Sequence, residues 1–154
     1  MSEVQALPRV GCGVAILDEE RLLLVRRKRM PEAGHWGLPG GKVDPFETVS
    51  AAAEREILEE LGIHIEADHL LGIVDQIDRE RNEHWVAPVY LVRSYEGVPT
   101  IMEPDALAEL GWFRLDDLPA PLTQSTLHAI RCLKAPPGGH PSNSANSRVE
   151  PAGT

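Results

Sequence analysis

The stretch that decides the fold is GKVDPFETVSAAAEREILEELGI, residues 41–63. Its acidic residues Glu56, Glu59 and Glu60 are three and four positions apart. Because an α-helix turns about 100° per residue, these side chains share one stripe roughly 100° wide. Like charges at this spacing destabilise a helix. A solvated acidic face would be the ordinary explanation, but the stretch after residue 42 contains no lysine, and Arg55 is expected to point away from the stripe's centre.

Three carboxylates that converge on one point suit a hard divalent cation. Mg²⁺ prefers oxygen ligands and is commonly shared between carboxylates, water and substrate phosphates. Gly40 and Gly41 precede the acidic stretch, and glycines allow a phosphate or its metal to approach the backbone closely. We therefore expect a cation that offsets the repulsion and allows an acidic protein to hold an acidic substrate.

The helix that carries the stripe has recognisable ends. Asp44 is the expected capping residue, with Pro45 in the first turn and Glu47 three residues after the cap. The helix is expected to run to about Leu61 and to stop at Gly62.

The remaining pattern indicates a mixed α/β chain. A second amphipathic helix is predicted at 122–134, with Leu122, Leu127, Ile130 and Leu133 on its apolar face. Residues 28–37 are predicted to form a loop. Strands are predicted at residues 9–17, 21–27, 70–78, 84–95 and 110–115.

Composition limits the classes of protein that remain. The 154 residues fit one domain, and 42% hydrophobic and 25% charged residues are ordinary for a globular protein. Two cysteines suggest neither a disulfide framework nor a zinc site, which favours a reducing, cytoplasmic location. The N-terminal sequence does not resemble a secretory signal, and no apolar run reaches the roughly 20 residues needed to span a bilayer. A net charge of −9 argues against binding to nucleic acid polymers or membranes.

Residues 41–63 resemble the signature of the Nudix hydrolases. That signature specifies glycine, glutamate, arginine and aliphatic residues at fixed spacing, and every specified position matches. With the preceding WGLPGG and the predicted strands, the resemblance covers roughly residues 8–134. The matching residues are Gly41, Glu47, Arg55, Glu56, Ile57, Glu59, Glu60, Gly62 and Ile63.

The resemblance implies a fold, an activity and a cofactor. The fold is an α/β/α sandwich with a mixed β-sheet between helices, here expected at residues 8–135. Residues 1–7 are expected to be a flexible N-terminus and residues 136–154 a disordered tail. Members of the family hydrolyse a nucleoside diphosphate linked to a second group, and they require Mg²⁺ or Mn²⁺.

The resemblance also implies roles for individual residues. Glu56 and Glu60 would be direct metal ligands, with Glu59 at the same cluster and the carbonyl of Gly40 completing the ligand set. One of the glutamates would accept the proton from water, with Glu56 a candidate, but the sequence does not separate the base from the ligands.

The two other charged residues of the signature have a structural role in this reading. Arg55 and Glu47 would form an ion pair that fixes the helix against the loop, and loss of that pair should misplace the metal ligands.

Other candidates lie outside the helix, and each has a simpler alternative. Glu103 would be a further ligand or base, or a solvated loop acid. Arg27 would meet substrate phosphate, as in MutT-type relatives, or be an exposed strand-end arginine. Trp36 would border the nucleotide pocket, although packing is the favoured role for it. Gly41 would allow a phosphate to approach the backbone. Trp85 and Trp112 are expected in or near the core.

The substrate is only partly indicated. Relatives that cleave ADP-ribose often carry a proline about 15 positions beyond the signature, and those that cleave dinucleoside polyphosphates a tyrosine. Residues 76–81, QIDRER, contain neither. Residues 102–119 are similar to MutT-type enzymes, which favours cleavage of a nucleoside or deoxynucleoside triphosphate to monophosphate and pyrophosphate.

Alternatives to that substrate and to catalysis itself stay open. One is an ADP-ribose or nucleotide-sugar pyrophosphatase, and the other is a non-catalytic nucleotide-sensing domain. A homodimer also stays open, because dimers are common among relatives.

Overall fold

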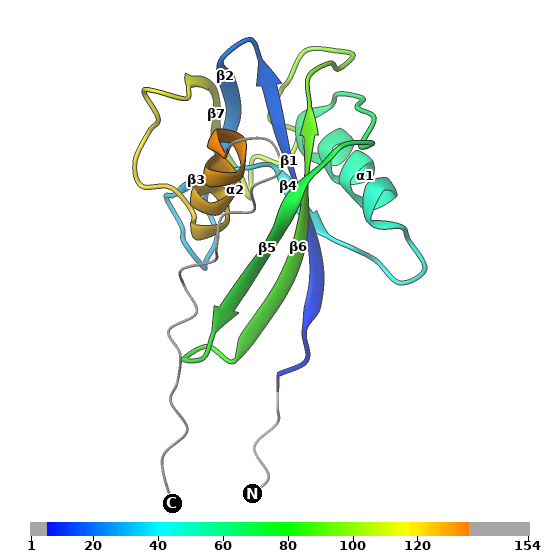
Figure 1. Ribbon diagram of the computed structural model, residues 1–154, viewed down its shortest axis with the longest axis vertical. Helices are drawn as coiled ribbons and strands as arrows, with labels where there is room; N and C mark the ends of the chain where they lie inside the picture. Colours follow the sequence, from blue (N-terminus) through cyan, green and yellow to red (C-terminus); the bar gives the residue numbers. More distant parts are fainter. Residues whose placement is uncertain (1–5, 136–154) are drawn as a thin grey trace, which may run out of the picture.

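The structure is a computed structural model that describes residues 6–135. A mixed sheet separates helix α1, Val49–Leu61, from helix α2, Gln124–Lys134, so that one helix covers each side (Figure 1). This arrangement confirms the expected α/β/α sandwich. The tail expected at 136–154 and most of the expected flexible N-terminus lie outside the described residues.

The strands are β1 Arg9–Asp18, β2 Arg21–Arg27, β3 Trp36–Gly37, β4 Gly40–Lys42, β5 Leu70–Asp78, β6 Glu83–Val92 and β7 Leu107–Arg114. The sheet is organised around β1, which pairs with β2, β4 and β6. The strand path is β3-β2-β1-β6-β5, with β4 paired to β1 and β7 paired to β2. The β1–β6 pair is parallel and the other named pairs are antiparallel.

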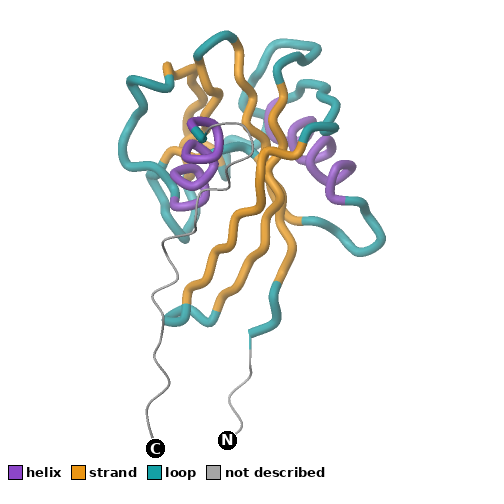
Figure 2. Tube along the Cα trace, in the orientation of Figure 1, coloured by secondary structure: helices purple, strands orange, loops and turns teal. Residues whose placement is uncertain are grey.

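Parts of β1, β5 and β6 extend past the ends of both helices (Figure 2). The hairpin between β5 and β6 lies at the far end of this extension (Figure 1). The side chains near that end are therefore not covered by a helix, and they are free to border a cavity.

Two apolar clusters hold the layers together. Val14 and Ile16 of β1 pack with Ile57 and Leu61 of α1 on one side of the sheet. On the other side, Ala129 and Ile130 of α2 belong to a cluster with alternate residues of β1 and β2. β1 thus contributes to both cores, because successive strand residues point to opposite faces.

Helix α1 begins four residues later than predicted. Thr48, rather than Asp44, is the capping residue, and its hydroxyl accepts a hydrogen bond from the N–H of Ala51 at 3.2 Å. Phe46 has φ of 67°, which is outside the helical region. Glu47 accepts from the N–H of Asp44 and turns toward Arg55 instead of starting the helix.

Several other boundaries also differ from the predictions. The predicted loop at 28–37 ends in β3, and β4 was not predicted at all, since strands of two and three residues give no periodic signal. β6 ends at Val92, β7 begins at Leu107 and α2 begins at Gln124. Leu127 was placed on the buried face of α2 but is exposed.

Thr126 and His128 are buried on α2 instead. The Thr126 hydroxyl accepts from the N–H of Leu38, which turns this side of the helix toward the sheet. Within the described residues, no helix combines the length and the apolar character that crossing a membrane requires. Both cysteines are free thiols.

Candidate active site

Arg55, in the middle of α1, is the centre of an acidic cluster. Its Nε and Nη2 donate to the two carboxylate oxygens of Glu47 at 2.8 and 2.9 Å, and Nη2 also donates to the carbonyl of Lys42. Nη1 donates to Glu56 at 3.0 Å and to Glu59 at 3.1 Å. Arg55 therefore joins the stripe of glutamates, contrary to the expectation that it would point away.

Gly41 provides the space that Glu56 occupies. A Cβ atom built at Gly41 would collide with the carboxyl group of Glu56. The next residue back, Gly40, has φ of 154°, and a Cβ there would collide with the carbonyl of Cys12. The two glycines of β4 are thus required by close contacts on both of its sides, on one side with β1 and on the other with α1.

Glu60, a residue of α1, is hydrogen-bonded to β4. Its carboxylate accepts from the N–H of Gly40 at 3.3 Å. The pKa of Glu60 is raised to about 8, mainly by burial and also by the charges of Glu56 and Glu103, while the Gly40 hydrogen bond and Arg27 oppose the rise. Burial also raises the pKa of Glu56, despite its hydrogen bond to Arg55. These two carboxyl groups are costly to ionise in the absence of a cation.

Glu103 lies close enough to raise the pKa of both Glu56 and Glu60. Its loop is attached to the site at two places. The N–H of Met102 donates to the carbonyl of Glu60 at 2.9 Å, and Nζ of Lys28 donates to the carbonyl of Pro104 at 2.6 Å. The structure therefore brings Glu103 to the glutamates of α1, and sequence reasoning gave no role to Lys28.

The described part of the chain contains no group of three His, Cys, Asp or Glu side chains already arranged to hold a metal ion. Arg55 is part of the reason, because its Nη1 binds one carboxylate oxygen of Glu56 and one of Glu59, and these oxygens are then not free to bind a cation. Glu59 is also half exposed. The donor set nevertheless fits a hard divalent ion, since Glu56, Glu60 and Glu103 bring mutually repelling carboxyl oxygens to one partly buried place.

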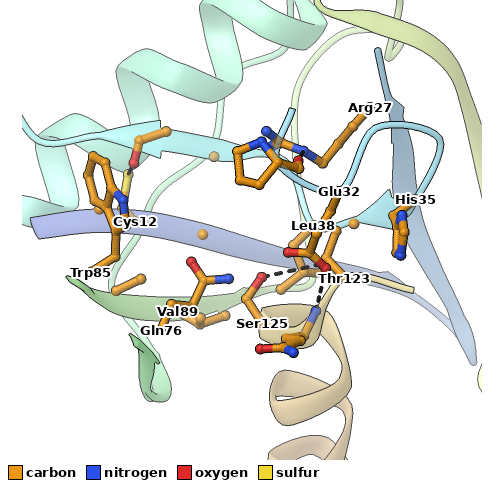
Figure 3. Close-up of a pocket in the computed structure, with 18 of the residues that line it drawn as sticks. Cys12, Arg27, Glu32, His35, Leu38, Gln76, Trp85, Val89, Thr123 and Ser125 are labelled. Atoms are coloured by element: carbon orange, nitrogen blue, oxygen red, sulfur yellow. Dashed lines mark hydrogen bonds between the residues drawn. The ribbon is translucent and has the colours of Figure 1, made fainter. Parts of the chain in front are cut away.

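A cavity of about 620 Å³ lies on the side of β4 that is opposite to Glu56 (Figure 3). It is bordered by β1, β4, β5, β6, the loop before β3 and the start of α2. Gly40 and Gly41 line it, while Glu56 lies against the opposite side of Gly41. The volume is in the range of pockets that hold small molecules.

Arg27 connects the cavity with the glutamates. It is half-buried, it lines the cavity, and its charge lowers the pKa of Glu60. Its Nε donates to the carbonyl of Pro31 at 3.1 Å, which fixes the guanidinium at the rim. Lys42, at the other end of β4 and paired with Gly11 of β1, adds a second positive charge to the lining.

Of the three tryptophans, it is Trp85 and not Trp36 that lines the cavity. Trp36 packs edge-on against Phe113, with ring centroids 5.0 Å apart, and is not part of the cavity lining. Trp112 stacks on Tyr95 at 5.9 Å. Trp85, which was expected in or near the core, lines the cavity instead. The only sequence signal for it was an aromatic residue in a strand, which is not distinctive.

The family model described as the NUDIX domain matches residues 7–133. The chain belongs to the Nudix family. This Nudix chain is similar to a solved MutT NUDIX hydrolase from Burkholderia pseudomallei, with 57% identity and a TM-score of 0.81. That match covers 82% of this chain and 98% of the solved one.

Two curated relatives show how varied similar Nudix proteins are. The human 8-oxo-dGDP phosphatase NUDT18 is 33% identical over 79% of this chain. The ADP-ribose pyrophosphatase of Methanocaldococcus jannaschii is 34% identical over 73% of this chain. The matched regions span 37% of the human protein and 65% of the archaeal one.

Proposed function

We propose that this Nudix protein hydrolyses a nucleoside or deoxynucleoside triphosphate to the monophosphate and pyrophosphate, using Mg²⁺ or Mn²⁺. One observation carries the proposal. A cluster of partly buried carboxylates and a cavity of about 620 Å³ lie on opposite sides of the same three-residue strand, with Arg27 at the junction. A nucleotide has two ends with matching requirements, a polyanion that needs cations and a base that needs a pocket.

The residues that would hold the metal are glutamates of the signature together with two groups from outside it. Glu56 and Glu60 are the principal ligands, supported by Glu59, Glu103 and the carbonyl of Gly40. The raised pKa values of Glu56 and Glu60 support this assignment, because a buried carboxyl group whose charge is costly to form gains most from a cation. When bound, the ion lowers the pKa of water and neutralises phosphate oxygens.

The chain's own groups complete the chemistry. Arg27 and Lys42 bind phosphate oxygens at the rim of the cavity, and the small residues Gly40 and Gly41 allow the phosphates to lie close to the backbone. Glu56 accepts the proton of the attacking water at a carboxylate oxygen. Arg55 and Glu47 position Glu56 without touching the substrate.

The test is a comparison of substrates with the full chain and Mg²⁺. Nucleoside triphosphates should release free phosphate only when a pyrophosphatase is added, because the product is pyrophosphate. Glu60→Gln is the matched control, and it should release almost none. Release of phosphate without the pyrophosphatase would contradict the proposed position of cleavage.

A second candidate is hydrolysis of ADP-ribose or a nucleotide sugar. It is favoured by the similarity to the archaeal ADP-ribose pyrophosphatase. A kcat/KM for ADP-ribose more than about tenfold above that of every triphosphate would replace the first proposal with this one. A non-catalytic sensor would instead show thermal stabilisation by Mg²⁺ and nucleotide without any product.

A further inference from the structure

β5 and β6 form one wall of the cavity, and the polarity of the side chains on this wall changes along the two strands. Residues that are directly opposite in the β5–β6 register lie on the same face of the sheet. Beginning beside the core and moving toward the hairpin, these pairs change from apolar to aromatic and amide, and then to acidic. The pairs are Gly72 with Val89, Val74 with Ala87, Gln76 with Trp85, and Asp78 with Glu83.

The floor beside this wall is hollow because its residues are small. A Cβ built at Gly11 would lie 3.6 Å from Cε3 of Trp85 and 3.8 Å from Cβ of Ala87. A Cβ at Gly13 would lie 3.6 Å from a methyl carbon of Val89. Larger side chains at these positions of β1 would fill the space that a flat ring needs.

Trp85 is the one tryptophan whose ring is available to a ligand. Trp36 and Trp112 have aromatic partners within the protein, whereas Trp85 lines the cavity. The guanidinium carbon of Arg9 lies 5.6 Å from the centroid of the Trp85 ring, and Gly11 lies beside it. Arg9 of β1 therefore supports the indole before any ligand arrives, and an aromatic ring of this kind is the surface on which bases stack.

Gln76 is the cross-strand neighbour of Trp85, and its amide lies between Trp85 and Ser125 in the cavity (Figure 3). Among the described residues, the Gln76 amide has no hydrogen-bond partner, although an amide offers both donors and acceptors. A flat ring on Trp85 would bring its polar edge to this amide.

Glu83 closes the series at the hairpin end. It is half-buried and lines the cavity, and within residues 6–135 it forms no ion pair. Asp78, its neighbour, already accepts from the N–H of Arg81. Glu83 lies two residues beyond Trp85 on β6, roughly 7 Å along the strand. A single-ring base on Trp85 would stop short of Glu83, whereas a two-ring base would reach it.

We propose that Trp85 and Gln76 read the nucleobase, and that Glu83 selects a purine with an exocyclic amino group. The amino group donates to the Glu83 carboxylate, while Arg27 at the opposite end holds the phosphates. The inference rests on the proposed binding of nucleotides, and it adds the class of base and the residues that recognise it.

The first experiment measures kcat/KM for GTP, ATP, ITP and UTP with Mg²⁺. ITP is a purine nucleotide without an exocyclic amino group, so it isolates the contribution of that group. The wild type should prefer GTP or ATP over ITP by about tenfold or more, and UTP should be poorer still. Equal rates for ITP, GTP and ATP would overturn the inference.

Glu83→Met should reduce the preference for the amino purine to about twofold or less without lowering kcat/KM for ITP. Glu80→Met is the matched control, because Glu80 is an exposed acid in the same hairpin and does not line the cavity. It should keep the wild-type preference. An unchanged preference in Glu83→Met, or the same loss in Glu80→Met, would reject the role of Glu83.

The second experiment measures binding without hydrolysis. AMP and GMP, added to the metal-free protein, should quench tryptophan fluorescence. The quenching should disappear in Trp85→Phe and persist in Trp112→Phe, and Gln76→Met should weaken binding while its melting temperature stays close to wild type. Quenching that persists in Trp85→Phe would overturn the assignment of the base site.

The two experiments separate this inference from the proposed function. Quenching at Trp85 without any hydrolysis of triphosphates would contradict the function and keep the base site. Hydrolysis of triphosphates with unchanged base preference in Trp85→Leu and Gln76→Met would contradict the base site alone.

Discussion

Arg55 donates two parallel hydrogen bonds to the carboxylate of Glu47, from Nε at 2.8 Å and from Nη2 at 2.9 Å. The remaining nitrogen, Nη1, is shared by Glu56 and Glu59. A lysine cannot reproduce this pattern, because its ammonium lacks the planar fork of guanidinium. The pair therefore fixes the entry of α1 and the orientation of Glu56 together.

Replacement of Arg55 should show both effects. Arg55→Lys is expected to lower kcat about 10- to 100-fold, as is usual when a group that orients a metal ligand is lost. The melting temperature should fall as well. Arg26→Lys, at an exposed and longer ion pair with Glu109, is the control and should change neither quantity. Wild-type turnover in Arg55→Lys would show that Glu56 does not need this support.

The same pair should make stability depend on pH in the acid range. Hydrogen bonds from Arg55 lower the pKa of Glu47 to about 2, from an ordinary 4.5. Because the folded-state value is the lower one, the stabilisation is fully present above about pH 4.5 and is lost as the pH falls toward 2. The difference in melting temperature between wild type and Glu47→Gln should therefore shrink over that window. A constant difference would contradict the assigned partner.

Glu60→Gln should separate catalysis from folding. We expect kcat to fall at least about a hundredfold and the stabilisation by Mg²⁺ to disappear. The metal-free melting temperature near pH 8 should stay the same or rise, since the substitution removes a buried charge and keeps an acceptor for the Gly40 N–H. A large loss of metal-free stability would show that Glu60 is mainly structural.

Gly41→Ala should displace the Glu56 carboxyl group, because the added Cβ occupies its place. Activity should fall strongly, and the shift in melting temperature caused by Mg²⁺ should decrease. Gly13→Ala is the control for this shift, since its Cβ would meet only ordinary contacts at 3.6 and 4.0 Å. An unchanged Mg²⁺ shift in Gly41→Ala would remove Glu56 from the metal site.

Lys28 should matter through the loop that carries Glu103. Lys28→Met removes the hydrogen bond to the carbonyl of Pro104, so we expect kcat to fall about tenfold and the Mg²⁺ concentration for half-maximal rate to rise. Arg29→Met, at the exposed neighbouring residue, should leave both values unchanged. Equal effects of the two substitutions would point to general electrostatics instead of loop position.

The helix and its glutamates could be predicted because their signal is local. Spacing by three and four residues defines a helix face, and Gly62 defines its end. The start was misplaced because Asp44 and Glu47 look like caps. The resemblance implied the ion pair between Glu47 and Arg55, but not that this pair keeps Glu47 out of the first turn and leaves Thr48 to cap.

The cavity could not be predicted, because its residues meet only through strand register. Gln76 and Trp85 are cross-strand neighbours, and Ser125 reaches the same space from α2. Trp36 was the more prominent candidate because it adjoins the glycines. Backbone hydrogen bonds join Trp36 to Pro121 and Thr123, just before α2, and its ring packs against Phe113 instead.

β4, which is only three residues long, separates the carboxylate cluster from the cavity. Under the proposed function, the glutamates that would hold the metal lie on one side of this strand and the residues that would contact the base lie on the other, with Arg27 between them. Substitutions on one side should then leave the other intact, so that substrate preference changes while the reaction stays the same. Substitutions of the cavity residues alone are therefore a route to a new nucleotide preference.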